Sequence, residues 1–134
     1  MSLGNSTSIG IAVSGLQAEA MRMKVISNNI ANANTSRTDS GEPFRRQDVL
    51  LSTSGDQLSG VTIEGLSDDT SSNFQSVYQP GHPDAGLDGY VSMPNVQLPV
   101  EMMNLVAASR AYQANAAVLK RYQDMVDVTV ELLK

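Results

Sequence analysis

The sequence predicts a mainly α-helical chain with a small β insert, in which two long terminal helices pair as an antiparallel coiled coil. Apolar residues recur at heptad spacing near both ends of the 134 residues. The middle of the chain holds seven of the ten glycines and nine of the 14 acidic side chains. We therefore assign residues 1–35 to an N-terminal helix, 36–96 to an acidic, turn-rich insert with short strands, and 97–134 to a C-terminal helix. The two helices together form the coiled-coil core.

The N-terminal helix is expected from about residue 6 to residue 33. Asn5 or Ser6 can cap it, because short polar side chains accept hydrogen bonds from the first free backbone amides. The Asn-rich stretch 32–36 favours a turn at the other end. One heptad row marks the packing face of this helix, and it consists of Ile9, Leu16, Met23 and Ile30.

The C-terminal helix carries the strongest periodic signal. Six positions spaced by seven residues are apolar or aromatic: Leu98, Leu105, Tyr112, Leu119, Val126 and Leu133. Pro99 suits the first helical turn, and Glu101 suits the positive end of the helix dipole. Each helix buries one stripe against the other, and both keep further apolar surface. The sequence therefore predicts a subunit of a larger helical assembly.

The insert is expected to contain three short strands, at 44–51, 59–66 and 74–78, because apolar and polar residues alternate there. Gly55, residues 67–69 and the Pro80–Gly81 pair separate them as turns. Three strands of this length predict a small sheet with a thin core.

The composition argues against several classes of function. A net charge of −5 leaves no basic surplus for binding nucleic acid. The absence of cysteine removes disulfides, zinc ribbons, iron–sulfur clusters and thiol catalysis. With one histidine and 4% aromatic residues, we expect no catalytic residue, no cofactor, no metal site and no small-molecule substrate. His82 is interpreted as a turn residue, because no set of ligands surrounds it in the sequence.

No segment of the sequence has the form of a membrane span or a cleaved signal. The apolar runs are only a few residues long, whereas a bilayer span needs about 20. Residues 1–10 lack the basic and apolar regions of a secretory signal peptide. We therefore expect no transmembrane segment and no cleaved signal peptide.

Three motifs occur in order along the chain, from the end of the first predicted helix into the last. They are the Asn-rich run 27–35, the segments 80–85 and 89–96, and the helical segments 101–105 and 108–115. In these motifs the chain resembles the flagellar basal-body rod protein family, which is related to the hook and hook-filament proteins. Within that family it is similar to the proximal rod proteins of the FlgC type.

The resemblance implies a structural subunit of the proximal rod of the bacterial flagellum, needed for flagellum-dependent motility. Such proteins leave the cell body unfolded through the type III export apparatus, without a cleaved signal, and assemble in the periplasm through their terminal helices. The implied partners are other rod proteins, the export-apparatus base and further copies in a helical assembly.

Two alternatives remain open at this point. The first is a soluble coiled-coil adaptor or export chaperone, and the second is an axial protein of the rod and hook family other than the FlgC type. A chaperone has no need of a long acidic insert between its helices, which favours the structural subunit.

The expected subunit-packing residues are the two heptad rows together with Asn28, Asn29, Asn32, Arg110 and Asn115. Periodicity alone favours a frayed helix end for the three N-terminal asparagines. The resemblance favours an interface ladder, because side-chain amides both donate and accept hydrogen bonds. Arg110 has three interpretations: a pair across subunits, a pair with Glu19 on the other helix, or a solvated side chain.

Overall fold

The computed structural model describes residues 8–53, 55 and 58–134. In chain order the elements are α1 (Ser8–Ala31), β1 (Gln47–Thr53), β2 (Val61–Asp68), β3 (Gln75–Tyr78), β4 (Tyr90–Met93) and α2 (Leu98–Leu132). Two long helices with an insert of short antiparallel strands confirm the predicted fold class.

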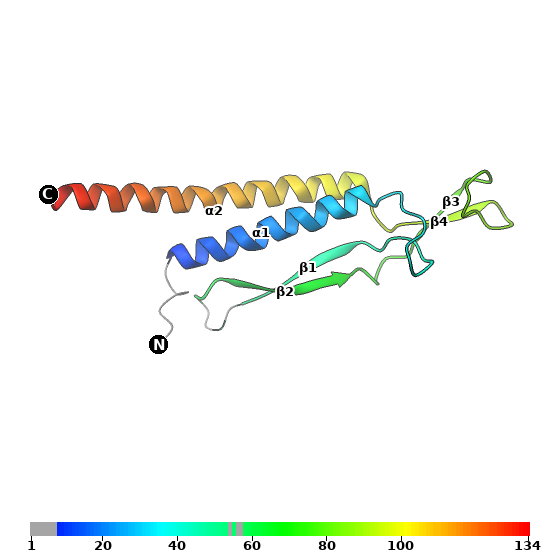
Figure 1. Cartoon of the computed structure of the whole chain (residues 1–134), viewed down its shortest axis with the longest axis horizontal. Helices are drawn as coiled ribbons and strands as arrows, with labels where there is room; N and C mark the ends of the chain where they lie inside the picture. The colour runs from blue at the N-terminus through cyan, green and yellow to red at the C-terminus, as the bar shows by residue number, and fades with distance from the viewer. Residues whose placement is uncertain (1–7, 54, 56–57) are drawn as a thin grey trace.

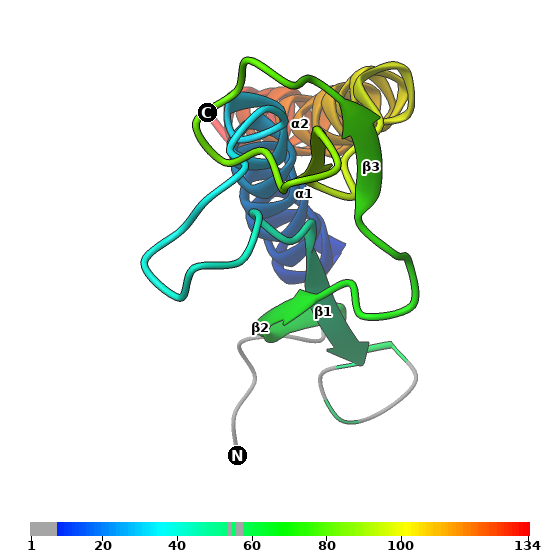
Figure 2. The ribbon, with the colours of Figure 1, turned by 90° about the vertical axis from the view of Figure 1, so that its right-hand side faces the viewer.

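The molecule is elongated and has three layers (Figure 1). Helix α1 contacts α2 on one side and strands β1 and β2 on the other, whereas α2 has no close contact with either strand among the described residues. The end-on view shows the same order, with α1 between α2 and the β1–β2 hairpin (Figure 2). The two helices run antiparallel, so the start of α2 lies beside the end of α1.

Helix α1 buries Ala12, Ala18, Val25, Ile26 and Asn29. Its predicted caps, Asn5 and Ser6, lie outside the described residues. At its other end the Asn32 side chain donates to the Asn28 carbonyl at 3.0 Å and accepts from the Thr35 hydroxyl at 3.1 Å. These local hydrogen bonds end the helix in the turn that the Asn-rich sequence predicts.

Two contacts fix the register of the helix pair. The amide of Asn29 reaches Glu101 at one end. At the other end a Cβ on Gly15 would lie 2.7 Å from the Asn115 amide nitrogen, so the helices approach closely there. In this register Ser8 lies opposite about residue 122, and α2 continues for ten more residues. Every residue from Lys120 to Lys134 is exposed.

The insert differs from the predicted three-stranded sheet, because it forms two separate two-stranded ribbons. Strands β1 and β2 pair antiparallel, and β2 runs on through Asp68, where a turn was expected. Strand β3 pairs with β4, which the sequence analysis missed. The Tyr78 and Tyr90 rings of this second ribbon lie 5.2 Å apart. Figure 1 shows the second ribbon beyond the end of the helices.

The β1–β2 hairpin is attached to α1 at Ser14. The Ser14 hydroxyl donates to the Ile11 carbonyl at 2.7 Å and accepts the Val61 amide at 3.2 Å. Gly60, with a φ of +83°, comes so close to Ser14 that a Cβ there would clash with its hydroxyl. Glycine is needed at this position for both its backbone angle and its missing side chain.

Candidate functional site

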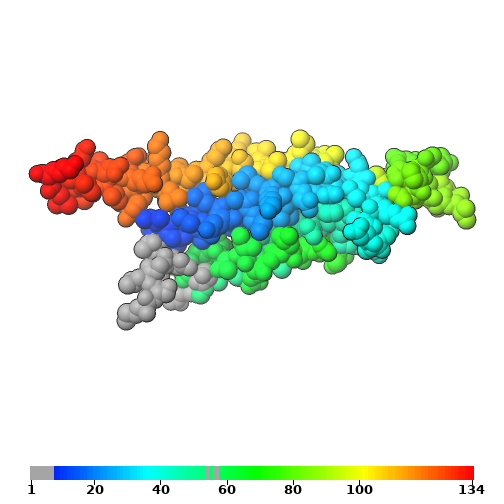
Figure 3. All heavy atoms as spheres, in the orientation of Figure 1, coloured from blue at the N-terminus to red at the C-terminus, as the bar shows by residue number. Residues whose placement is uncertain are grey.

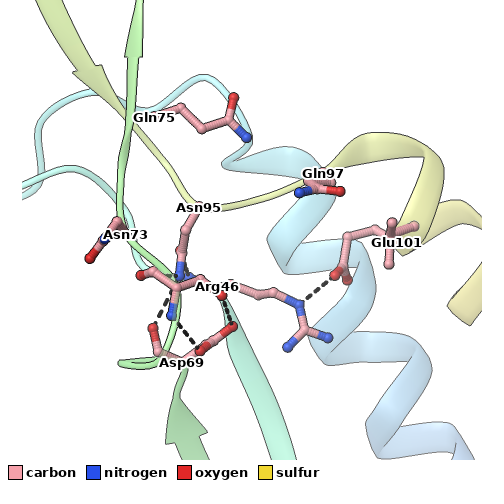
Figure 4. Close-up of a pocket in the computed structure, with 9 residues that line it drawn as sticks. Arg46, Asp69, Asn73, Gln75, Asn95, Gln97 and Glu101 are labelled. Carbon is pink, nitrogen blue, oxygen red and sulfur yellow. Dashed lines mark hydrogen bonds and ion pairs between the residues drawn. The ribbon is translucent and has the colours of Figure 1, made fainter.

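The end of α1, the start of β1 and the first turn of α2 meet at a cluster of polar side chains, which we call the polar junction. It consists of Asn29, Arg46, Asn95 and Glu101, and Figure 4 shows the last three with their neighbours. Three of the four are almost without exposed surface: Asn29 is 0% exposed, Asn95 7% and Glu101 1%. A buried polar group is costly unless it is hydrogen-bonded, so these side chains need partners.

Glu101 is the centre of the polar junction. Its Oε1 accepts from the Nε of Arg46 at 2.6 Å, and its Oε2 accepts from the Nδ2 of Asn29 at 3.2 Å. The carboxylate also lies in the first turn of α2, where the helix dipole favours a negative charge. Both oxygens are therefore satisfied inside the chain.

Asn29 joins three elements with one side chain. Its Oδ1 accepts the backbone amide of Gln47 at 3.0 Å, and its Nδ2 donates to the Gln47 carbonyl at 2.8 Å. The same Nδ2 donates to Glu101. One asparagine thus continues the hydrogen bonding of β1 from the side of α1 and links both elements to α2.

Asn95 likewise connects several segments, which are the residues that flank β1, β2 and α2. Its Oδ1 accepts the Arg46 amide at 2.7 Å, and its Nδ2 donates to the Asp69 carbonyl at 3.0 Å. The Asp69 amide in turn donates to the Arg46 carbonyl at 2.8 Å. The residues before β1, after β2 and before α2 are held together as a result.

Two pKa values respond to these contacts. The pKa of Arg46 is raised: burial alone lowers it, and the hydrogen bond and charge of Glu101 more than offset that effect. Beside the junction, the pKa of Asp69 is lowered, chiefly because the Ser71 hydroxyl donates to its carboxylate. Since the charged groups of the junction are already paired with each other, the arrangement is suited to holding elements together.

The predicted packing residues are only partly enclosed. On α1, Ile9, Leu16, Met23 and Ile30 are half-buried. On α2, Leu105, Asn115 and Leu119 are half-buried, whereas Leu98, Tyr112, Val126 and Leu133 are exposed. Asn28 is exposed, Asn32 caps its own helix, and Asn29 has no side-chain surface left for a neighbour.

Arg110 is exposed and forms no ion pair with any described residue. Glu19, the partner expected within the chain, instead pairs with Arg22 one turn along α1, at 3.5 Å. The pair between Arg110 and Glu19 within one chain is therefore wrong.

The buried row of α2 was not predicted from the sequence. Glu101 and Ala108 are its buried residues, and Asn115 follows at the same spacing against Gly15. A search for apolar heptads passes over a row made of glutamate, alanine and asparagine. In the sequence, the only sign of this row is that its three residues, which are small or polar, are spaced by seven.

Helix α2 keeps a broad apolar surface that no described residue covers. Its exposed large apolar residues are Leu98, Val100, Met102, Met103, Val106, Tyr112, Val118, Tyr122, Met125, Val126, Val128, Val130 and Leu132, and the capping residue Leu133 is also exposed. In the space-filling view, the C-terminal part of α2 extends beyond α1 (Figure 3). An exposed apolar surface of this size marks an interaction site.

Three other features bear on function among the described residues: the lone histidine, any cluster of metal-binding side chains, and any helix that could span a membrane. His82 lies in a turn, where its Nδ1 accepts the Asp84 amide at 3.0 Å. In the described part of the chain, no three acidic or histidine side chains gather closely enough to hold a metal ion. None of the helices described combines the length and hydropathy needed to cross a bilayer.

Comparisons with known proteins identify the family. A model described as "Flagella basal body rod protein" matches residues 9–37, and one described as "Flagellar basal body rod FlgEFG protein C-terminal" matches residues 87–132. These two matches cover the two helices and their flanks.

Curated relatives match along almost the whole chain. The flagellar basal-body rod protein FlgC of Agrobacterium fabrum is 39% identical over 92% of this chain and 91% of its own length. FlgC of Borreliella burgdorferi is 36% identical over 98% and 99%, and FlgC of Bacillus subtilis is 34% identical over 95% and 97%. The chain therefore belongs to the FlgC family of flagellar basal-body rod proteins.

Proposed function

We propose that this chain is a structural subunit of the proximal rod of the flagellar basal body and enters it through its terminal helices. The match to FlgC proteins over more than nine-tenths of both chains carries this proposal. It favours the rod subunit over an adaptor or export chaperone, and over a rod or hook protein of another type.

The exposed surface of α2 supports assembly through the helices. The last turns of α2 lie beyond the described part of α1 and keep Met125, Val128 and Leu132 more than half exposed. Covering apolar side chains with a neighbouring subunit contributes roughly 1.5–3 kcal/mol for each one that becomes fully buried. The neighbours in this proposal are other rod proteins, the export-apparatus base and further copies of the chain.

Export without a cleaved signal, in an unfolded state, is part of the same proposal. A chain without cysteine passes into an oxidising compartment with no risk of wrong disulfides. We propose the periplasmic part of the basal body as its final location.

The test is a triple variant, Met125→Ser, Val128→Ser and Leu132→Ser, expressed in bacteria that lack the native gene. Losing three apolar contacts weakens docking by more than about a hundredfold. We expect the variant to be made and exported, to be absent from isolated basal bodies, and to leave the cells unable to swim.

Leu87→Ser is the matched control, because Leu87 is the most exposed large apolar side chain among the described residues and lies in the insert. It should support swimming. Normal swimming with the triple variant, or loss of swimming with the control alone, would place the assembling surface elsewhere.

A further inference from the structure

The two outer layers of the molecule carry opposite charges. Strands β1 and β2 contain three charged residues, Asp48, Glu64 and Asp68, and all three are acidic and exposed. From residue 102 to residue 123, α2 contains Arg110, Lys120 and Arg121, and all are basic and exposed. Because α1 separates these layers, the acidic and basic side chains lie on opposite outer sides of one subunit.

Each outer layer also has apolar side chains beside its charges. We define the acidic face as Asp48, Leu50, Glu64, Leu66 and Asp68, and the basic face as Met103, Val106, Arg110 and Arg121. Leu66 is 48% exposed and Val106 is 52% exposed. Val106 and Arg110 are each about 200° around the helix axis from the buried Ala108, so they point away from α1.

The two faces match along the length of the molecule. The first residue of β2, Val61, is hydrogen-bonded to Ser14 of α1. The last, Asp68, pairs with Gln47, which is hydrogen-bonded to Asn29 near the other end of α1. Between these two points the strand advances by seven residues and the helix by fifteen. Both lengths are about 23 Å, because a strand rises more per residue than a helix. Glu64 is then about 10 Å from the Ser14 end. Arg110 is about 8 Å from Asn115, which lies beside Gly15 at that same end.

Leu66 and Val106 match in the same way. Leu66 is about 7 Å further along the strand than Glu64, and Val106 is about 6 Å further along the helix than Arg110, in the same direction. Glu64 is also the extra residue of a β-bulge, since Leu50 pairs with Gly65 and Leu51 with Ile63. Bulges commonly redirect a side chain.

We propose that the acidic face of one copy docks on the basic face of the next copy, with Glu64 opposite Arg110 and Leu66 opposite Val106. A sideways step brings these faces together, and a small rotation at each step is compatible with the same contact. Because the two faces differ, the contact is heterologous, and repetition builds a ring or a helical filament. This inference rests on the proposed function and assigns one lateral contact within the assembly.

Charge reversal tests the ionic half of the contact. Glu64→Lys or Arg110→Glu alone places like charges together, and we expect incorporation into basal bodies to fall about tenfold or more. The double variant carrying both changes restores the pair and should recover most of the loss. Asp39→Lys, an exposed acidic residue outside the acidic face, is the matched control and should have no effect. A double variant as defective as either single variant would overturn the inference.

Cross-linking tests the apolar half. Leu66→Cys and Val106→Cys chains are expressed together in cells that lack the native gene, and isolated basal bodies are treated with a short bismaleimide. The chain has no native cysteine, so the introduced thiol is the only one that each copy carries. We expect mixed dimers from the pair of variants and no dimer from either variant alone. Dimers of the Val106→Cys chain alone, cross-links to a different rod protein, or no product would each overturn the proposal.

Swimming of cells that express the unmodified chain separates the two proposals. If these cells do not swim and their basal bodies lack the chain, the proposed function fails and the lateral contact fails with it. If they swim and the chain is present, but the mixed dimers do not form, the lateral contact alone is wrong.

Discussion

Glu101 is a charged residue with almost no exposed surface, and it depends on Arg46 and Asn29 for its partners. Arg46 is different, because its side chain is 20% exposed and can reach water without Glu101. Loss of one member of the pair therefore has unequal effects. Removing the arginine leaves a buried carboxylate, whereas removing the carboxylate leaves a cation that can be hydrated.

The stabilities of variants should follow this inequality. Arg46→Ala should lower the free energy of unfolding by about 3–5 kcal/mol, because an unpaired charge stays buried. Glu101→Gln should cost less, since its amide oxygen still accepts a hydrogen bond. The double variant Arg46→Ala with Glu101→Gln should be more stable than Arg46→Ala alone. Urea unfolding followed by circular dichroism measures the free energy of unfolding of all three variants. A smaller loss of stability in Arg46→Ala than in Glu101→Gln would contradict this explanation.

At the scale of elements, the register of the helix pair is set by small residues and amides more than by leucines. Gly15 lies against Asn115, and the buried positions of α2 are Glu101 and Ala108. Small side chains let two helices approach closely. The half-buried Leu105 and Leu119 flank this row, whereas Tyr112 between them is exposed.

A cross-link within one chain tests the register. Ala12 is buried, and in the observed register it lies opposite about residue 118, beside Leu119. Ala12→Cys with Leu119→Cys should therefore give a product that migrates as a monomer after treatment with a short cross-linker. Ala12→Cys with Met102→Cys is the control, since Met102 lies about 24 Å along α2 from the position opposite Ala12. Reaction of the control pair instead would indicate a parallel arrangement of the two helices.

The sequence predicted both helices and three strands because each has a local pattern that its own residues reveal. Strand β4 has only four residues, and it exists through its pairing with β3, where Val91 faces Val77. The polar junction was hidden for a similar reason. Asn29 was singled out for a different role, and its contact with Glu101 joins residues 72 positions apart in the sequence. Such a contact is a property of the folded chain, with no signature in any single segment.

For the molecule as a whole, stability is unevenly distributed along its length. One end has three packed layers and the polar junction, whereas the other ends in the exposed last turns of α2. An isolated helix without a packing partner is only marginally stable in water. The purified chain should therefore be firmly structured at the junction and loosely structured at the end of α2.

Amide hydrogen exchange measures this difference directly. We expect slow exchange around Ala18, Asn29, Val49 and Ala108, and fast exchange from residue 123 to the end of α2. In assembled basal bodies the last turns of α2 should become protected, because neighbours cover them. Equally slow exchange along all of α2 in a demonstrated monomer would contradict this expectation.

The antiparallel pairing of the two helices also has a consequence for the order of folding during synthesis. The apolar stripe of α1 is made first, and its main partner, α2, is the last element in chain order. Until the ribosome has released α2, α1 has only the β1–β2 hairpin to pack against, and the Glu101 that Asn29 requires does not yet exist. Contacts this distant in sequence form late. The nascent chain is thereby kept from its native state until α2 has been synthesised.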